Sequence, residues 1–156
     1  MPRLSEHFSL TEAYKSATAD RRGIDNQPPQ EYHERLSLVA ESILEPVRNH
    51  YGVPFVPSSW YRCPDLNEAI GSKPTSDHIQ GYAVDFEVPG VSNEDLARWC
   101  SENLTFEQLI LEFYSPDDPR AGWVHCSIAP EGEEPKMEIL TISKAGTVRG
   151  LPEIEA

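Results

Sequence analysis

Helical and strand periodicities are separated along this chain, and their order restricts the folds that it can adopt. Apolar residues recur every three or four positions from Tyr32 to Tyr51, which predicts one long amphipathic helix ending at Gly52. Pro46 interrupts this pattern and predicts a kink or a break. Segments with strand character lie mostly later, as QLILEF, WVHCSI and EILTIS. Helices followed by strands favour an α+β fold, with a small antiparallel sheet packed against helices, over a doubly wound parallel sheet.

Local signals predict the remaining elements. Ser9 and Glu12 have the spacing of a capping box, so we expect a helix over residues 10–18. PDLNEAIG predicts a short helix, and Ser92 is suited to cap a helix over NEDLARWCSENL. FVPSSWYR and YAVDFEV are expected to be strands, the first leading into a loop, and a turn at residues 144–146 leads into a terminal strand.

Length and charge limit the class of protein. The 156 residues suit a single domain, 1–156, with a core of its own. The formal net charge of −13 argues against a basic surface that neutralises phosphates, so we expect no nucleic-acid partner. No apolar run reaches the roughly 18 residues of a membrane helix, and the first ten residues lack an apolar stretch of signal-peptide length. We therefore expect a soluble, cytoplasmic protein with no membrane partner.

The three cysteines, Cys63, Cys100 and Cys126, are far apart in the sequence and form no C-x-x-C pair. Their odd number and spacing argue against a disulfide framework and against a thiolate zinc site. We interpret them as reduced thiols, which agrees with the expected cytoplasmic location.

A catalytic zinc ion commonly has three protein ligands drawn from His, Asp, Glu and Cys, with a fourth position open to water. His78 lies seven residues before Asp85 in SDHIQGYAVDF, and strand alternation places Asp85 on one face with the small Ala83. Gly81 permits a sharp turn that would fold His78 back over this strand. The spacing indicates a metal site; the alternative is a surface histidine and a half-exposed strand aspartate.

His125 is the third candidate ligand. In GWVHCSI it shares one strand face with Trp123 and Ser127, whereas Cys126 points to the other face and is expected in the core. A histidine inside an apolar strand needs a polar partner, either a metal ion or a hydrogen-bonding group in the core. The other three histidines lie in polar surroundings and are expected at the surface.

Together these segments resemble a known family. SDHIQGYAVD matches the pattern S-x-H-x-x-G-x-A-x-D of the M15 zinc peptidases, and WVHCS resembles the segment that carries their last ligand. SSWYRCPDLNEAIGSKPTSDH, HFSLTEAYKS and GIDNQPP resemble other segments, so the likeness covers about Ser5 to Ile128. The family includes peptidoglycan D-Ala-D-Ala carboxypeptidases and phage L-alanyl-D-glutamate endolysins, and it shares a fold with the Hedgehog signalling domain. The resemblance implies a Hedgehog/DD-peptidase-like fold and a zinc ion (Zn2+) held by His78, Asp85 and His125.

Zinc-dependent hydrolysis also requires a general base, usually a carboxylate beside the metal but not bound to it. We expect Glu112 in this role. It lies at the end of QLILEF with Leu109, Leu111 and Phe113 on the opposite face, and a glutamate in so apolar a strand is costly without a purpose. Its position resembles that of an acidic residue at a strand end in the Hedgehog-like members.

The assignment of the base has alternatives. Several endolysin members place the acid two or three residues before the last histidine, where this chain has Gly122 and Trp123. Asp117 and Asp118 lie in a Pro-rich loop, which suits a rim or a lid better than a rigid base. Glu112 could instead be a solvated residue of an edge strand.

The family resemblance adds Arg62 and Ser76 to the expected site. Arg62 resembles the family arginine that steadies the developing oxyanion or a substrate carboxylate, a role suited to a permanently charged fork. Ser76 matches the family serine two residues before the first ligand and would bind substrate or orient a partner. Without the family match, the alternatives are a surface arginine and a turn hydroxyl.

The resulting hypothesis is a zinc metallopeptidase that hydrolyses peptide bonds in peptidoglycan stem peptides, with Glu112 and Arg62 catalytic. The bond is either D-Ala-D-Ala or L-Ala-D-Glu, and the resemblance includes phage endolysins that accumulate in the host cytoplasm. The alternative is a zinc-stabilised binding module of the same fold that does no chemistry. A carboxylate close to the metal distinguishes the two, because only the enzyme needs a base.

Overall fold

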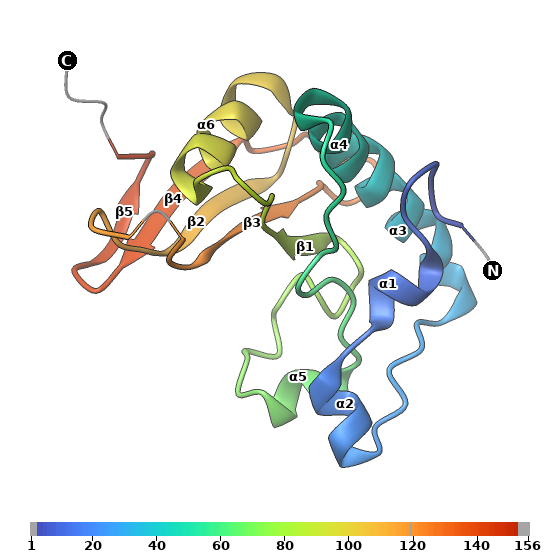
Figure 1. Cartoon of the computed structure of the whole chain (residues 1–156). Helices are drawn as coiled ribbons and strands as arrows, with labels where there is room; N and C mark the ends of the chain where they lie inside the picture. Colours follow the sequence, from blue (N-terminus) through green and yellow to red (C-terminus); the bar gives the residue numbers. More distant parts are fainter. Residues whose placement is uncertain (1–2, 119, 153–156) are drawn as a thin grey trace.

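Within residues 3–118 and 120–152, which the computed structural model describes, five strands form one sheet in the order β1-β3-β2-β4-β5 (Figure 1). The α+β class and the strands expected in YAVDFEV and in the later segments are confirmed. The strands are β1 (Ala83–Phe86), β2 (Gln108–Tyr114), β3 (Trp123–Ser127), β4 (Glu138–Ser143) and β5 (Gly146–Arg149).

Helices cover one face of this sheet. Figure 1 shows α6 and α4 over that face, whereas α2 and α5 lie at the other side of the molecule, beyond β1. Within the described residues, no helix combines the length and the hydropathy that a membrane span requires. The helical segments are α1 (Leu10–Tyr14), α2 (Ala17–Arg22), the 3-10 turn η1 (Gln30–Tyr32), α3 (His33–Val39), the π-helical turn η2 (Ala40–Leu44), α4 (Glu45–Tyr51), α5 (Pro64–Ala69) and α6 (Asn93–Asn103).

The helix expected over residues 10–18 is two helices. The capping box is confirmed, because the Ser9 hydroxyl accepts a hydrogen bond from the Glu12 backbone and the Glu12 carboxylate accepts one from the Ser9 backbone. Lys15 then adopts an extended conformation, and the Ser16 side chain caps α2 by accepting from the Ala19 N–H. A second serine cap within the segment therefore divides the predicted helix.

Pro46 interrupts the long helix, as its sequence predicts. It has no N–H to donate to the carbonyl of Ser42, and the chain widens into η2 directly before α4. At the other end, Gly52 adopts a left-handed conformation with φ 67° and its N–H donates to the Arg48 carbonyl.

Strand alternation gives the sheet two different faces. Asp85 is the direct partner of His125, and Glu112 is the partner of Trp123, so these four side chains share the face away from the core. The predicted position of Cys126 in the core is confirmed. The residues on the core face of β1, β2 and β3 are fully buried: Val84, Phe86, Leu109, Leu111, Val124 and Cys126.

Two predictions about strands were wrong. β4 runs parallel to β2, so the sheet is mixed, because the chain leaves β3 and passes β2 before β4 begins on its far edge. FVPSSWYR is not a strand, since Pro57 within it cannot donate to a ladder, and the segment makes only an isolated bridge between Ser59 and Asp85 in the described chain.

A β-bulge near the end of β2 overturns the predicted orientation of Phe113. Between the pairs Leu111–Thr141 and Tyr114–Ser143, β2 contains one residue more than β4. Phe113 takes a left-handed conformation with φ 53° and is 59% exposed, so it does not share the core face with Leu111. Opposite the bulge, a Cβ at Gly122 would lie 1.7 Å from the Glu112 carbonyl oxygen, so only glycine permits this approach.

The Glu45 carboxylate joins α4 to the N-terminal segment. It accepts hydrogen bonds from the Ser5 hydroxyl at 2.6 Å and from the His7 backbone N–H at 2.7 Å, and its other oxygen lies 2.6 Å from His7 Nδ1. Burial raises the pKa of Glu45, but these bonds and the charge of His7 outweigh it, so the pKa is below its ordinary value.

We expect Glu45→Ala to lower the free energy of unfolding by about 1–3 kcal/mol at neutral pH, because partly buried donors lose their acceptor. A carboxyl with a lowered folded-state pKa stabilises the fold above its unfolded pKa, and that contribution is lost as pH falls through its folded pKa. The difference between variant and wild type should therefore shrink on acidification. Urea unfolding measures it, with the exposed Glu41→Ala of the same helical region as control; equal effects of the two changes would contradict the assignment.

Candidate metal centre

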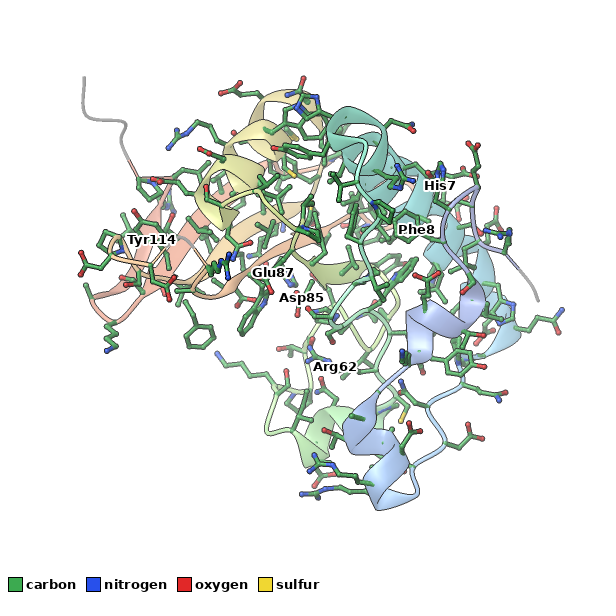
Figure 2. All side chains as sticks on the ribbon, viewed as in Figure 1. His7, Phe8, Arg62, Asp85, Glu87 and Tyr114 are labelled. Carbon is green, nitrogen blue, oxygen red and sulfur yellow. The ribbon has the colours of Figure 1, made fainter. Side chains whose placement is uncertain are left out.

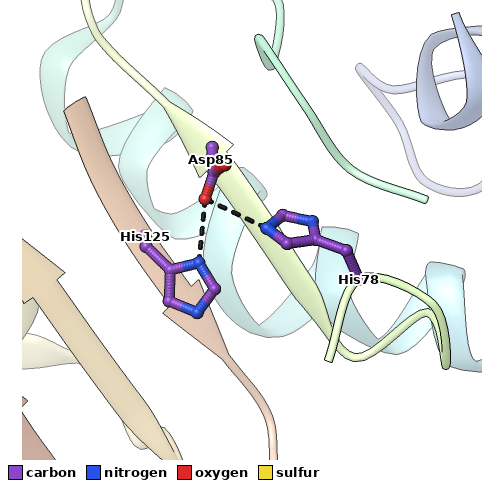
Figure 3. Close-up of side chains that lie close together, drawn as sticks. All are labelled: His78, Asp85 and His125. Atoms are coloured by element: carbon purple, nitrogen blue, oxygen red, sulfur yellow. Dashed lines mark hydrogen bonds and ion pairs between the residues drawn. The ribbon is translucent and has the colours of Figure 1, made fainter. Parts of the chain in front are cut away.

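Three buried side chains from different segments lie close together on the face of the sheet away from the core (Figure 3). His78 lies in the turn before β1, Asp85 in β1, and His125 opposite Asp85 in β3. Asp85 Oδ1 lies 3.2 Å from His78 Nε2 and 2.9 Å from His125 Nδ1. The three candidate ligand atoms all lie within 4.8 Å of one another. This cluster could hold a metal ion.

The hydrogen bond of His78 identifies the nitrogen that can bind a metal. His78 Nδ1 lies 2.6 Å from the Trp60 carbonyl oxygen, which can only accept, so Nδ1 carries the proton. In the neutral ring, Nε2 then has a lone pair directed at the Asp85 carboxylate 3.2 Å away. Two lone pairs at this distance repel each other unless a proton or a cation lies between them. A backbone carbonyl bonded to the other ring nitrogen is the usual arrangement at metal-binding histidines.

The electrostatics of the cluster favour a charged carboxylate. Burial raises the pKa of Asp85, but the charges and hydrogen bonds of His78 and His125 outweigh burial and hold this pKa well below its usual range. Burial lowers the pKa of His125, and its bond to Asp85, with the charges of Asp85 and Glu112, reverses this and raises the pKa above its ordinary value. Asp85 is therefore an anion that draws positive charge into a buried position.

The cluster has the chemistry of a zinc site. Zinc is bound by histidine nitrogen and carboxylate oxygen at about 2.0–2.2 Å, so ligand atoms at neighbouring corners of a tetrahedron lie roughly 3.3 Å apart. The separations of 3.2 and 2.9 Å from Asp85 Oδ1 are close to this value. Two histidines and one carboxylate would leave a fourth position for water, as at catalytic zinc ions. The residues present thus fit the metal that the sequence predicts.

Glu112 lies on the same face, diagonal to His125 across β2 and β3. The Trp123 indole N–H donates a hydrogen bond of 2.7 Å to Glu112 Oε2, which fixes the carboxylate and leaves Oε1 for other contacts. Burial raises the pKa of Glu112; the charge of Asp85 adds to this, whereas the bond from Trp123 and the two histidines oppose it. The position and the raised pKa suit a general base that must later release its proton.

Arg62 and Ser76 are joined to the cluster through the loop that carries His78. The Ser76 hydroxyl accepts from Arg62 Nη2 at 3.2 Å and from the His78 backbone N–H at 3.3 Å, and the Arg62 backbone N–H donates to the His78 carbonyl. Figure 2 shows Arg62 beyond Asp85, on the side of α5. Burial lowers the pKa of Arg62, and the charges of Asp85 and Glu112 counteract it, so the guanidinium belongs to the electrostatic environment of both carboxylates.

A cavity of about 590 Å³ opens beside these residues and includes Arg62, Asp85 and Trp123 among its walls. Its remaining charged wall residue is Lys15, so apart from Asp85 the cavity presents positive charge in a protein of net charge −13. A larger cavity of about 800 Å³ between the end of β1 and the start of α6 contains none of the clustered residues. Of these two cavities, the first is therefore the one that adjoins the cluster.

The other candidates for the base lie elsewhere. Asp117 and Asp118 are exposed in the loop after β2, so the structure does not bring them into the cluster. Two contacts were missed by sequence reasoning: the Trp60 carbonyl that orients His78 and the Trp123 N–H that holds Glu112. A backbone carbonyl has no signature in the sequence, whereas the alternation in WVHCS does place Trp123 on the ligand face.

Comparison with known proteins agrees with this geometry. The model of a family described as Peptidase M15 matches residues 6–127, a span that includes all three residues of the cluster and also Arg62 and Glu112. No curated protein matches the chain. The family match indicates peptidase activity.

Proposed function

Because this chain belongs to the peptidase M15 family, we propose that it is a zinc-dependent peptidase acting on the stem peptides of bacterial peptidoglycan. The observation that carries the proposal is the buried cluster of His78, Asp85 and His125 with the Glu112 carboxylate on the same sheet face. A binding module would need the three ligands but not an additional, partly buried carboxylate beside them.

Different residues have different roles in the proposed hydrolysis. A zinc ion in the cluster would polarise the scissile carbonyl and make water nucleophilic at neutral pH. Glu112 Oε1 accepts the proton from the attacking water and passes it to the leaving amine, while the Trp123 N–H holds Oε2 in place. The Arg62 guanidinium, steadied by Ser76, stabilises negative charge on the reacting carbonyl oxygen or on a substrate carboxylate.

Two observations support a stem peptide as substrate. The motifs of this chain resemble those of peptidoglycan carboxypeptidases and endolysins, and the positively charged residues of the cavity wall, Arg62 and Lys15, suit a peptide that carries carboxylates. The N-terminal segments HFSLTEAYKS and GIDNQPP resemble phage-type members, which supports a role as an endolysin that reaches the cell wall from the host cytoplasm. D-Ala-D-Ala and L-Ala-D-Glu are the two candidate bonds.

Digestion of purified peptidoglycan, followed by mass spectrometry of the products, tests the proposal. Cleavage of D-Ala-D-Ala releases free alanine, whereas cleavage of L-Ala-D-Glu exposes a new amino group on glutamate, so the products identify the bond. We expect a chelator to abolish cleavage and stoichiometric zinc to restore it. Cleavage that persists after complete removal of metal would exclude zinc dependence, and intact peptidoglycan after zinc loading would exclude the substrate.

A further inference from the structure

The bulge in β2 turns an aromatic side chain out of the core and toward the site. Phe113 is 59% exposed and has a left-handed φ of 53°, a conformation that is costly for a bulky residue. Regular alternation from Leu111 would have buried this ring against the helices. Outside the core the ring packs against Trp123, and more than half of the residue's surface stays available for a further contact.

The exposed ring is continuous with the wall of the cavity. The Phe113 and Trp123 ring centroids lie 5.0 Å apart, and Trp123 lines the cavity that contains Arg62 and Asp85. Trp123 also donates to Glu112, the residue next to Phe113 in β2. One aromatic wall, formed by Phe113 and Trp123, therefore begins directly beside the Glu112 carboxylate.

The direction of proton transfer relates this wall to one side of the substrate. Glu112 gives its proton to the leaving amine, so that amine must come within hydrogen-bond distance of the carboxylate. The substrate chain that continues from the amine then passes the residues adjoining Glu112. On the basis of the proposed function, we propose that Phe113 is a specificity-determining residue that contacts aliphatic side chains of the leaving portion of the peptide.

Two zinc-loaded assays with Phe113→Gly test this inference. The substrates are two stem peptides that share the bond identified by product analysis, one ending a single residue after that bond and the other continuing for several residues. We expect the KM of the longer peptide to rise roughly fivefold, as for the loss of about 40 Å² of apolar contact, with kcat unchanged. Both constants for the shorter peptide should stay at the wild-type values. Phe113→Tyr, which keeps the ring, should behave as wild type.

A second readout does not depend on turnover. In a Glu112→Gln background, in which the amide oxygen can still accept from Trp123, calorimetry should show that Phe113→Gly weakens binding of the longer peptide by the same factor. Glycine adopts a φ of 53° without strain, so the melting temperature of the Phe113→Gly variant should not fall below that of wild type. Met137→Gly is the matched control, because Met137 also has a left-handed φ of 51° and is 42% exposed. It lies before β4, where its sulfur accepts a hydrogen bond from the Phe106 N–H, whereas Phe113 contacts Trp123. The control variant should change neither KM.

Several results would overturn the inference. An unchanged KM for the longer peptide, or equal losses for both peptides together with a lower melting temperature, would make Phe113 a purely structural residue. Release of single terminal residues only would mean that no leaving chain reaches the aromatic wall. Wild-type protein that cleaves neither peptide would instead show that the proposed function has failed, and the inference would fall with it.

Discussion

Replacing Glu112 with glutamine is expected to lower kcat by about a thousandfold, the contribution of a positioned general base. Glutamine has the same shape, and its amide oxygen can accept the hydrogen bond that Trp123 donates at 2.7 Å. Since Glu112 is not one of the clustered ligands, bound zinc should remain at the wild-type level. Steady-state kinetics on stem peptide, with metal analysis of the same samples, measures both quantities.

The same variant should be at least as stable as wild type without metal. Burial raises the pKa of Glu112, so the folded protein binds this proton more tightly than the unfolded chain. The glutamate therefore costs stability once pH exceeds its unfolded pKa, and the full cost is present above its folded pKa; glutamine removes it. In zinc-loaded wild type, kcat/KM should fall as pH decreases through the pKa of Glu112, which the positive charge of the ion lowers relative to the metal-free fold, and the residual activity of the variant should lack this pH dependence.

Asp117→Asn and Asp118→Asn are the matched controls for the base. Both aspartates are exposed in the loop after β2, so neither change should lower kcat appreciably. Full activity of Glu112→Gln would remove Glu112 from the mechanism, and a loss in one of the loop variants would transfer the role to that residue. Zinc binding without cleavage in wild type would favour the non-catalytic binding module.

Much of the cluster could be predicted because strand alternation assigns the faces of Asp85 and His125, while the family resemblance selected these two residues together with His78. Asp85 and His125 each lie on a regular strand, and their faces can be assigned from residues two positions away, so their meeting across β1 and β3 needed only the correct pairing. Their buried contact with His78 could not be read in this way. It depends on the turn before β1 and on the Trp60 carbonyl, a backbone group that any residue would supply.

Departures from regular geometry explain the failures. Strand alternation assumes that each residue of a strand has one partner in the neighbouring strand. The extra residue in β2 breaks this rule, so Phe113 does not have its expected orientation, while Glu112 keeps its predicted face. The sequence shows a glycine at position 122 but gives no reason for it. Its close approach to the Glu112 carbonyl follows only from the pairing of β2 with β3. The parallel pairing of β4 with β2 was not predicted, because it depends on the path of the segment that connects β3 to β4. Local sequence patterns do not encode that path.

Asp85→Asn should weaken zinc binding by at least about 100-fold, since loss of an outer partner of a metal ligand alone costs 10–100-fold. Asparagine keeps the size of the buried side chain and can still accept from His125 Nδ1, but it removes the anion that both histidines face. Competition with a chromophoric chelator measures the affinity. In wild type, zinc at about 100 times its Kd should add roughly 2.7 kcal/mol to the free energy of unfolding, and the variant should gain little at the same concentration.

Glu87→Gln separates loss of a ligand from loss of a nearby negative charge. Glu87 follows Asp85 by two residues, but it is exposed and accepts a hydrogen bond from Asn93 instead of facing the histidines. Its removal should leave zinc affinity and the zinc-induced stabilisation at the wild-type level. Because Asp85 is stabilised as an anion in the metal-free fold, Asp85→Asn also lowers stability without zinc at neutral pH, so the comparison uses the zinc-induced change within each protein. Equal zinc-induced changes in wild type and Asp85→Asn would show that the cluster is a hydrogen-bonded core and not a metal centre.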